Sequence, residues 1–154
     1  MLSITALEHV FRHIAEIRPE VDSDGKVVEY MPQSRYAAAK CARLHRYGQG
    51  PFCKFKIQVS NGLAGVYVIN VMGNIKYVGE CENLKQRFNN QYGNISPRNC
   101  FVRGQVTNCK INNLILRETQ NGHQVDLWFL ETPDRKRIEK ELLLRIKPDW
   151  NSSL

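Results

Sequence analysis

The chain has 154 residues, of which 42% are hydrophobic and 24% are charged. This length and balance are typical of one globular domain and leave too little chain for two substantial cores. No apolar stretch approaches the roughly 20 residues of a membrane span, and the N-terminus lacks the basic-then-apolar layout of a signal peptide. Five cysteines without CxxC spacing argue against a disulfide framework or a zinc module, so we expect reduced thiols and a cytoplasmic location.

The formal net charge of +7 is concentrated around two stretches that contain no acidic residue, 30–79 and 83–117. Because each phosphate that a basic side chain neutralises releases counterions, such stretches favour nucleic-acid binding over a merely solvated basic face. The candidate nucleic-acid-binding residues are Arg35, Lys40, Arg43, Arg46, Lys54, Lys56, Lys76, Lys85, Arg98, Arg103 and Lys110.

The N-terminal part contains patterns of both helix and strand. Apolar residues over 4–17 follow the helical period and predict an amphipathic helix. A short strand over 26–31 and an Ala-rich, basic helix over 35–47 follow it. We expect residues 1–62 to form a basic helix-and-strand extension that packs on a core formed by residues 63–154.

Residues 53–59 alternate strictly between apolar and polar side chains. Cys53 and Phe55 fall on one side, and Lys54 and Lys56 fall on the other. Side chains alternate across a strand, so this pattern predicts a half-buried strand with a basic outer face.

The centre of the chain carries two runs rich in β-branched residues and tyrosine, 66–71 and 75–78. The residues between them, 72–74, have the turn chemistry of a tight hairpin. Each run contains one tyrosine, Tyr67 in the first and Tyr77 in the second. We expect the two runs to pair as antiparallel strands.

A helix is predicted directly after this hairpin. Asn83 is a candidate N-cap, and Gln86, three residues on, is its capping-box partner. Leu84, Phe88 and Tyr92 recur at intervals of four residues, which places them on one face of the helix.

Three more elements complete the predicted fold. A helix capped by Thr107 or Asn108 is followed by a strand over 124–130 and by a last helix, which Thr132 caps and which ends near Lys147. Together the elements predict an α+β fold with a small three-stranded antiparallel sheet flanked by helices.

Glu139 falls in the middle of the apolar face of this last helix, with Leu142 and Ile146 at i+3 and i+7. An ionised carboxylate in such a place is costly unless it is paired or metal-bound. Glu139 is therefore a metal ligand, a partner for an arginine such as Arg87, or close enough to the helix edge to reach water. Glu141, by contrast, points elsewhere on the helix, as an exposed ion-pairing residue does.

The spacing of these residues resembles that of the GIY-YIG nuclease family. Gly-Val-Tyr at 65–67 is followed by Tyr-Val-Gly at 77–79, with ten residues from tyrosine to tyrosine, and ten further residues lead to Arg87. Glu139 and the Pro-Asp-Trp-Asn sequence at 148–151 resemble the C-terminal signature of the same family. The matching elements extend over more than half of the chain.

This resemblance implies a DNA endonuclease that hydrolyses phosphodiester bonds by a one-metal mechanism with Mg²⁺, or alternatively Mn²⁺. Its catalytic residues would be Tyr67, Tyr77, Arg87, Glu139 and Asn151. Tyr67 would help to deprotonate the attacking water and Tyr77 would position water or phosphate. Arg87 would bind two phosphate oxygens, because its guanidinium is forked and always charged. Glu139 would bind the metal ion through its carboxylate. Asn151 would fix the C-terminal turn by hydrogen bonding.

One position departs from the family pattern. Many members carry His or Tyr four residues after the arginine, where this chain has Gln91, which cannot accept a proton. A phenol with its ordinary pKa of about 10 needs nearby positive charge to act as a base near neutral pH. The base is then Tyr67 alone or a histidine such as His45. Cys81 replaces the Thr or Ser that is common after the second motif.

The implied partner is DNA, and a homodimer is one route to double-strand cleavage because a single active site cuts one strand. Restriction-type, mobile-element and repair nucleases all fit this class. The alternative is a catalytically weak nucleic-acid-binding module that keeps the nuclease fold. A structural interaction domain with an incidental basic face is a third interpretation.

Overall fold

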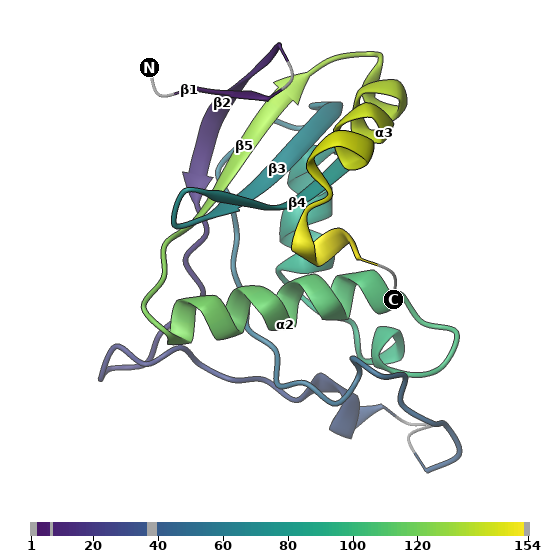
Figure 1. Cartoon of the computed structure of the whole chain (residues 1–154). Coiled ribbons are helices and arrows are strands. Elements are labelled where there is room, and N and C mark those ends of the chain that lie inside the picture. The colour runs from purple at the N-terminus through teal and green to yellow at the C-terminus, as the bar shows by residue number, and fades with distance from the viewer. Residues whose placement is uncertain (1–2, 7, 37–39, 153–154) are drawn as a thin grey trace. The chain divides into compact units, whose positions relative to one another are not determined.

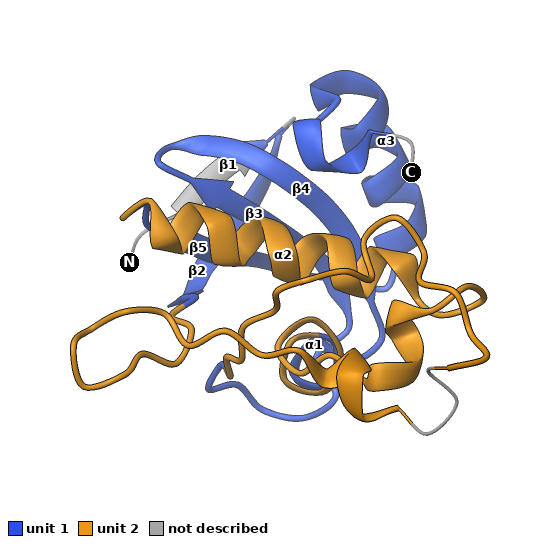
Figure 2. Cartoon of the chain, turned by 90° about the horizontal axis from the view of Figure 1, so that it is seen from below, with its two compact units in different colours: residues 1–17, 57–87, 123–153 blue, residues 18–56, 88–122, 154 orange. Residues whose placement is uncertain are grey.

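The computed structural model describes residues 3–6, 8–36 and 40–152. The chain divides into two compact units, which are coloured separately in Figure 2. Unit 1 comprises residues 1–17, 57–87 and 123–153, and unit 2 comprises residues 18–56, 88–122 and 154. Both units are discontinuous along the chain, and the boundary at residue 62 that the motifs suggested falls inside unit 1.

Unit 1 is built on a five-stranded antiparallel sheet with the order β1-β2-β5-β3-β4 (Figure 1). The strands are β1 (Ser3–Ala6), β2 (His9–Glu16), β3 (Gly65–Val71), β4 (Asn74–Cys81) and β5 (Val125–Glu131). The predicted central hairpin is confirmed, and the α+β class is confirmed with it. Met72 and Gly73 both have positive φ in the β3–β4 turn, as the tightest hairpin turns require. The sheet has five strands rather than the predicted three.

The two additional strands come from residues predicted as a helix. The described residues of the range 4–17 form most of the β1–β2 hairpin instead, and β2 pairs with β5; residue 7 lies outside the described residues. A helix would place Val10 and Phe11 on the same apolar face, whereas β2 buries Phe11 completely and leaves Val10 57% exposed. The prediction was wrong because the backbone groups along β5 need a partner strand, and that tertiary pairing outweighs a local helical pattern.

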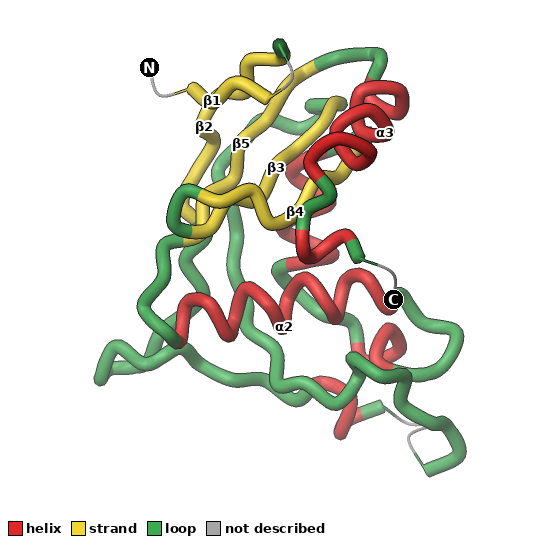
Figure 3. The backbone as a smooth tube through the Cα atoms, in the orientation of Figure 1, coloured by secondary structure: helices red, strands yellow, loops and turns green. Residues whose placement is uncertain are grey.

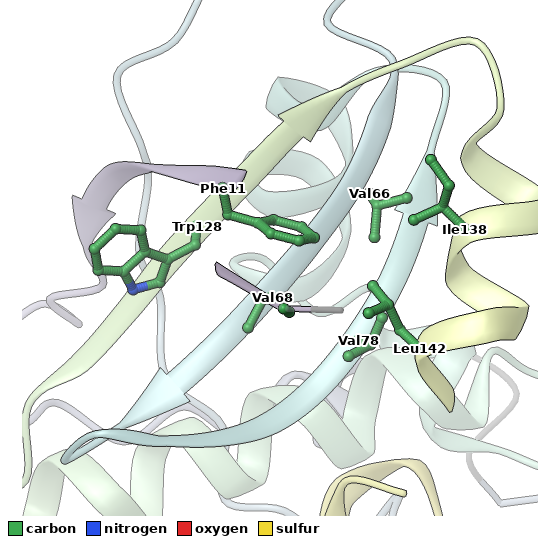
Figure 4. Close-up of a cluster of buried hydrophobic side chains, with 8 residues drawn as sticks. Phe11, Val66, Val68, Val78, Trp128, Ile138 and Leu142 are labelled. Carbon is green, nitrogen blue, oxygen red and sulfur yellow. The ribbon is translucent and has the colours of Figure 1, made fainter. Parts of the chain in front are cut away.

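One face of the sheet is covered by α3 (Arg135–Ile146). Figure 4 shows Val66, Val68 and Val78 of the sheet beside Ile138 and Leu142 of this helix, in one buried cluster. β5 and α3 lie within one or two residues of the predicted strand and helix, so both predictions are confirmed. Among the described residues, no helix has the length and apolar character needed to cross a membrane.

Unit 2 consists largely of extended segments, with α2 (Val106–Gln120) as its long helix (Figure 3). The predicted helix at 84–92 is present as α1 (Leu84–Gln86), which continues as a π-helix (Arg87–Tyr92) and passes from unit 1 into unit 2. Asn83 caps it as predicted, because its side chain accepts a hydrogen bond from the Gln86 N–H at 3.2 Å. Short 3₁₀ helices occur at Pro32–Arg35, Pro97–Cys100 and Asp149–Asn151.

The helix predicted over 35–47 is wrong for the described residues of that range, and residues 37–39 lie outside them. The described part continues from a 3₁₀ turn into turns and one isolated bridge. Its main-chain groups pair with the segment 100–102: Leu44 forms a bridge with Phe101, and the Arg43 carbonyl accepts from the Val102 N–H. These pairings replace the hydrogen bonds that a helix would make within itself.

Residues 53–59 and 26–31 are extended but do not join the sheet, so these two strand predictions are wrong. Tyr30 and Phe52 form an isolated bridge instead. The predicted alternation nevertheless holds, since Cys53 and Phe55 are buried and Lys56 is exposed. All five cysteines are free thiols.

Candidate active site

The β3–β4 hairpin brings the two predicted tyrosines together. Tyr67 lies opposite Gly79 in the ladder and is 1% exposed. The ring centroids of Tyr67 and Tyr77 are 6.1 Å apart. A Cβ atom added to Gly79 would lie 2.3 Å from the Tyr67 hydroxyl oxygen, so the phenol passes directly over this glycine. Because β4 is the edge strand, this contact directs the Tyr67 hydroxyl toward the edge of the sheet.

Glu139 reaches the neighbouring residue of β4 from α3. Its carboxylate accepts a hydrogen bond from the Glu80 backbone N–H. Partial burial and the negative charge of Glu80 raise the pKa of Glu139, although this hydrogen bond and the positive charge of Arg87 act in the opposite direction. Tyr67 and Glu139 therefore meet the same short segment of β4, at Gly79 and Glu80.

Arg87 completes the group of residues at this edge. It is half-buried and follows α1 directly. Its positive charge acts on Glu139 and also opposes the effect of burial on Cys81, whose pKa is raised to about 11. The guanidinium is therefore within range of electrostatic interaction with both the Glu139 carboxyl and the Cys81 thiol at the end of β4. The structure thus brings Tyr67, Arg87 and Glu139 together around residues 79–81.

Asn151 is held at the next position along β4. Its Oδ1 accepts from the Val78 N–H at 2.8 Å, and its Nδ2 donates to the Val78 carbonyl at 2.9 Å. One carboxamide thereby satisfies both main-chain groups of Val78 at the outer edge of the sheet, as a further strand would. Asn151 secures the C-terminal turn on β4 in this way.

Arg135 and Glu80, which were not singled out from the sequence, also lie beside Glu139 and Arg87 at this edge of the sheet. Arg135 of α3 forms ion pairs with Glu80 and, at 3.2 Å, with Glu82. Arg135 and Glu80 are about one fifth exposed, so their pair is largely shielded from solvent. The sequence did contain a signal for Arg135. Arg135 precedes Glu139 by four residues, and residues at this spacing lie on the same face of a helix.

The donor groups at this edge fit a hard cation that takes few protein ligands. Among the described residues, no group of three or more His, Cys, Asp or Glu side chains is arranged to hold a metal ion. Mg²⁺, however, commonly binds one or two carboxylates and completes its shell with water and phosphate oxygens. Glu139 suits this role because burial and the adjacent Glu80 disfavour its charge, and a cation would relieve both effects.

The histidine considered as a base is engaged elsewhere. The Nδ1 atom of His45 accepts from the Tyr47 N–H at 3.1 Å, and its Nε2 bonds to the Asn99 carbonyl. Both ring nitrogens are thus used within unit 2. Tyr92, next to Gln91, is buried with its ring against Phe88.

Most of the predicted nucleic-acid-binding residues lie in unit 2. This unit holds 12 of the 22 basic residues and 5 of the 15 acidic ones, so it carries the entire net charge of +7. Lys110 was expected to be exposed but is buried. Its pKa is lowered, mainly by burial and to a smaller extent by the positive charge of Arg46. Lys76 and Lys85 belong to unit 1, where Lys76 pairs with Asp149 at 3.2 Å.

Comparison with known proteins gives a match at the level of structure. No family model and no curated protein sequence matches the chain. The chain is similar to a solved structure of a mutant of EndoII from bacteriophage T4, with a TM-score of 0.50 and 17% sequence identity. The match covers 71% of this chain and 86% of that one, and it supports the α+β fold.

Proposed function

We propose that this chain is a DNA endonuclease that hydrolyses phosphodiester bonds with the help of a divalent cation. The observation that carries the proposal is the convergence of Tyr67, Arg87 and Glu139 on residues 79–81 at the edge of the sheet. The similarity to EndoII, a nuclease of the GIY-YIG type, supports this class of fold.

Each residue has a chemical task in this proposal. Arg87 binds the non-bridging oxygens of the scissile phosphate and neutralises the charge that develops on them. Tyr67 acts as a phenolate, a form that the positive charge of Arg87 at the same edge favours: its oxygen takes the proton of the attacking water and leaves a hydroxide as the nucleophile. Tyr77 beside it positions that water or the phosphate. Glu139, in its ionised form, would hold Mg²⁺ or Mn²⁺, whose chemistry there is to neutralise the leaving oxygen.

The surrounding residues keep this arrangement in place. Arg135 pairs with Glu80 and so limits the repulsion between Glu80 and Glu139. Asn151 holds the C-terminal turn against β4. The basic residues of unit 2 supply the sequence-independent attraction for the DNA backbone.

The test is nicking of a supercoiled plasmid in Mg²⁺ and in EDTA, with Glu139→Gln beside the wild type. We expect cleavage in Mg²⁺ and a loss of about a hundredfold or more in the variant, because it removes the only charged donor assigned to the cation. Plasmid binding in EDTA should be retained by the variant. The matched control is Glu141→Gln on the same helix, which should cleave within about twofold of the wild type.

Two outcomes would contradict the proposal. Undiminished cleavage by Glu139→Gln would remove Glu139 from the site. Plasmid binding without cleavage by the wild type, in both Mg²⁺ and Mn²⁺, would favour the alternative, a nucleic-acid-binding module that retains the fold without the activity.

A further inference from the structure

Unit 2 contains two adjoining cavities that the proposed chemistry does not use. The first has a volume of about 200 Å³ and the second about 400 Å³, and both are lined by Lys54 and Asn94. We call these two cavities together the unit 2 groove. The rings of Tyr30 and Phe52 are part of the lining of the first cavity, and polar and charged side chains form a larger share of the lining of the second.

The first cavity has aromatic and apolar side chains over part of its wall. Tyr30 and Phe52 both line it, and their backbones are joined by two hydrogen bonds of 2.7 and 3.0 Å. The Tyr30 hydroxyl is bonded to Glu20, which fixes the orientation of the ring. A cavity of this size is smaller than the roughly 300–1,000 Å³ of sites for whole small molecules, so it suits a single planar ring system.

The charge of the groove is predominantly positive. Arg35 and Lys54 line the first cavity, and Arg18 and Lys56 join Lys54 in the second. The Lys54 Nζ atom lies 4.4 Å from the centroid of the Tyr30 ring. Glu20 is the acidic residue among the lining side chains, and it is occupied by the tyrosine hydroxyl. Proteins that bind single-stranded nucleic acid combine a positively charged groove, which follows the phosphates, with aromatic rings on which the bases stack.

The wall that carries the lysines is held rigidly. The side chain of Asn112, on α2, accepts from the Cys53 N–H at 2.9 Å and donates to the Cys53 carbonyl at 2.8 Å. The Phe55 N–H donates to the Gly93 carbonyl at 3.1 Å. Because residues alternate along this extended segment, anchoring Cys53 and Phe55 presents Lys54 to the groove. Hydrogen bonds within the fold therefore hold this wall of the groove in place.

We propose that the unit 2 groove binds unpaired DNA, with one base in the cavity beside Tyr30 and the flanking phosphates on Lys54, Lys56, Arg18 and Arg35. The inference deepens the proposed function and rests on it for the identity of the polymer. A base pair does not fit the first cavity, so the nucleotide that occupies it is an unpaired one.

The test measures binding of the full chain in EDTA, so that no cleavage is involved. Fluorescence anisotropy compares an eight-residue oligothymidylate with a strand of eight abasic sites that carries the same phosphates. We expect the oligothymidylate to bind about tenfold more tightly, because base–aromatic stacking contributes at this level. Tyr30→Leu should abolish this difference, and Tyr30→Phe, which keeps the ring, should preserve it.

A second variant separates the phosphate contacts from the base contact. Lys54→Ala should weaken both strands several-fold and reduce the slope of log K against log salt by about 0.7. Lys26→Ala removes the same charge from an exposed position of unit 2 outside both cavities, and it should bind as the wild type does. Thermal unfolding of each variant establishes that it is folded.

Equal binding of the two strands by the wild type, or no effect of Tyr30→Leu, would overturn the inference. Tighter binding of an oligouridylate than of the oligothymidylate would assign the groove to RNA and overturn it as stated. These results are independent of the plasmid assay. A protein that binds through Tyr30 but never cleaves contradicts the proposed function alone, and a protein that cleaves but binds both strands equally contradicts the groove alone.

Discussion

Glu139 is the residue at which function and stability conflict. It lies on the helix face that packs on the sheet, where burial and Glu80 raise the pKa of its carboxyl. If Glu139 had only a structural role, a neutral side chain at this position would be more stable, because the surroundings disfavour the charged carboxylate. The cost is understandable if the charge is needed to hold a cation.

This conflict predicts that Glu139→Gln stabilises the fold at neutral pH. The folded state holds the Glu139 proton more tightly than the unfolded chain, so wild-type stability falls as pH rises through the interval between the unfolded pKa, about 4.3, and the higher folded one. Gln has no such dependence. We expect a Tm about 1–3 °C above that of the wild type at pH 7, and no difference below about pH 4.

Differential scanning calorimetry across this pH range, without divalent cations, measures the effect. Glu141→Gln is the control, since the Glu141 side chain is 37% exposed and pairs with the exposed Arg137; this variant should shift the Tm by about a degree or less. A Glu139→Gln variant that is less stable than the wild type at pH 7 would show that the carboxylate is well compensated in the folded chain.

At the scale of elements, the edge strand β4 organises the site. Tyr67 crosses it at Gly79, Glu139 bonds to it at Glu80, and Asn151 pairs with it at Val78. An exposed strand edge leaves main-chain groups unpaired, and Asn151 satisfies two of them. The residues that position the site therefore also protect the edge.

Removing the Asn151 carboxamide should loosen the C-terminal turn from β4. Asn151→Ala loses two hydrogen bonds to Val78, and we expect the free energy of unfolding to fall by about 1–3 kcal/mol in urea titrations. Amide hydrogen exchange at Val78 should speed up. Asn151→Asp keeps one acceptor but turns a carboxylate oxygen toward the Val78 carbonyl, so it should destabilise the fold as well. Equal stability of all three proteins would rule out the anchoring role.

At the scale of the whole molecule, charge and proposed chemistry are divided between the two units. Unit 1 carries the candidate catalytic residues with equal numbers of acidic and basic side chains, and unit 2 carries the whole net charge. Electrostatic attraction for DNA is long-ranged and independent of sequence, so it can be supplied by one unit while the other performs the reaction.

Affinity for duplex DNA should therefore depend on the exposed basic residues of unit 2. In EDTA, Arg43→Ala combined with Arg98→Ala should reduce the slope of log K against log salt by about two. Lys140→Ala combined with Arg145→Ala removes the same charge from unit 1 and should leave the slope unchanged. A larger effect of the unit 1 pair would place the main DNA contact on α3.

The sequence by itself determined the elements whose signals are local. The β3–β4 turn, the Asn83 cap, β5 and α3 follow from backbone preferences and side-chain periods that act over a few residues. The spacing of Tyr67, Arg87 and Glu139 was likewise visible, because those residues occupy regular elements. The basic outer face at Lys54 and Lys56 followed from simple alternation.

Only the tertiary structure decided the rest. The described residues of 4–17 lie mostly in strands because β5 has an edge to pair, and residues 40–47 are not helical because their backbone groups bond to the segment 100–102. Arg135 shares a helix face with Glu139, but its ion pair with Glu80 depends on the packing of α3 against β4, which no local pattern specifies. For the two predicted helices, the free energy gained by pairing distant backbone groups exceeded the local helical preference, which is less than about 1 kcal/mol per residue.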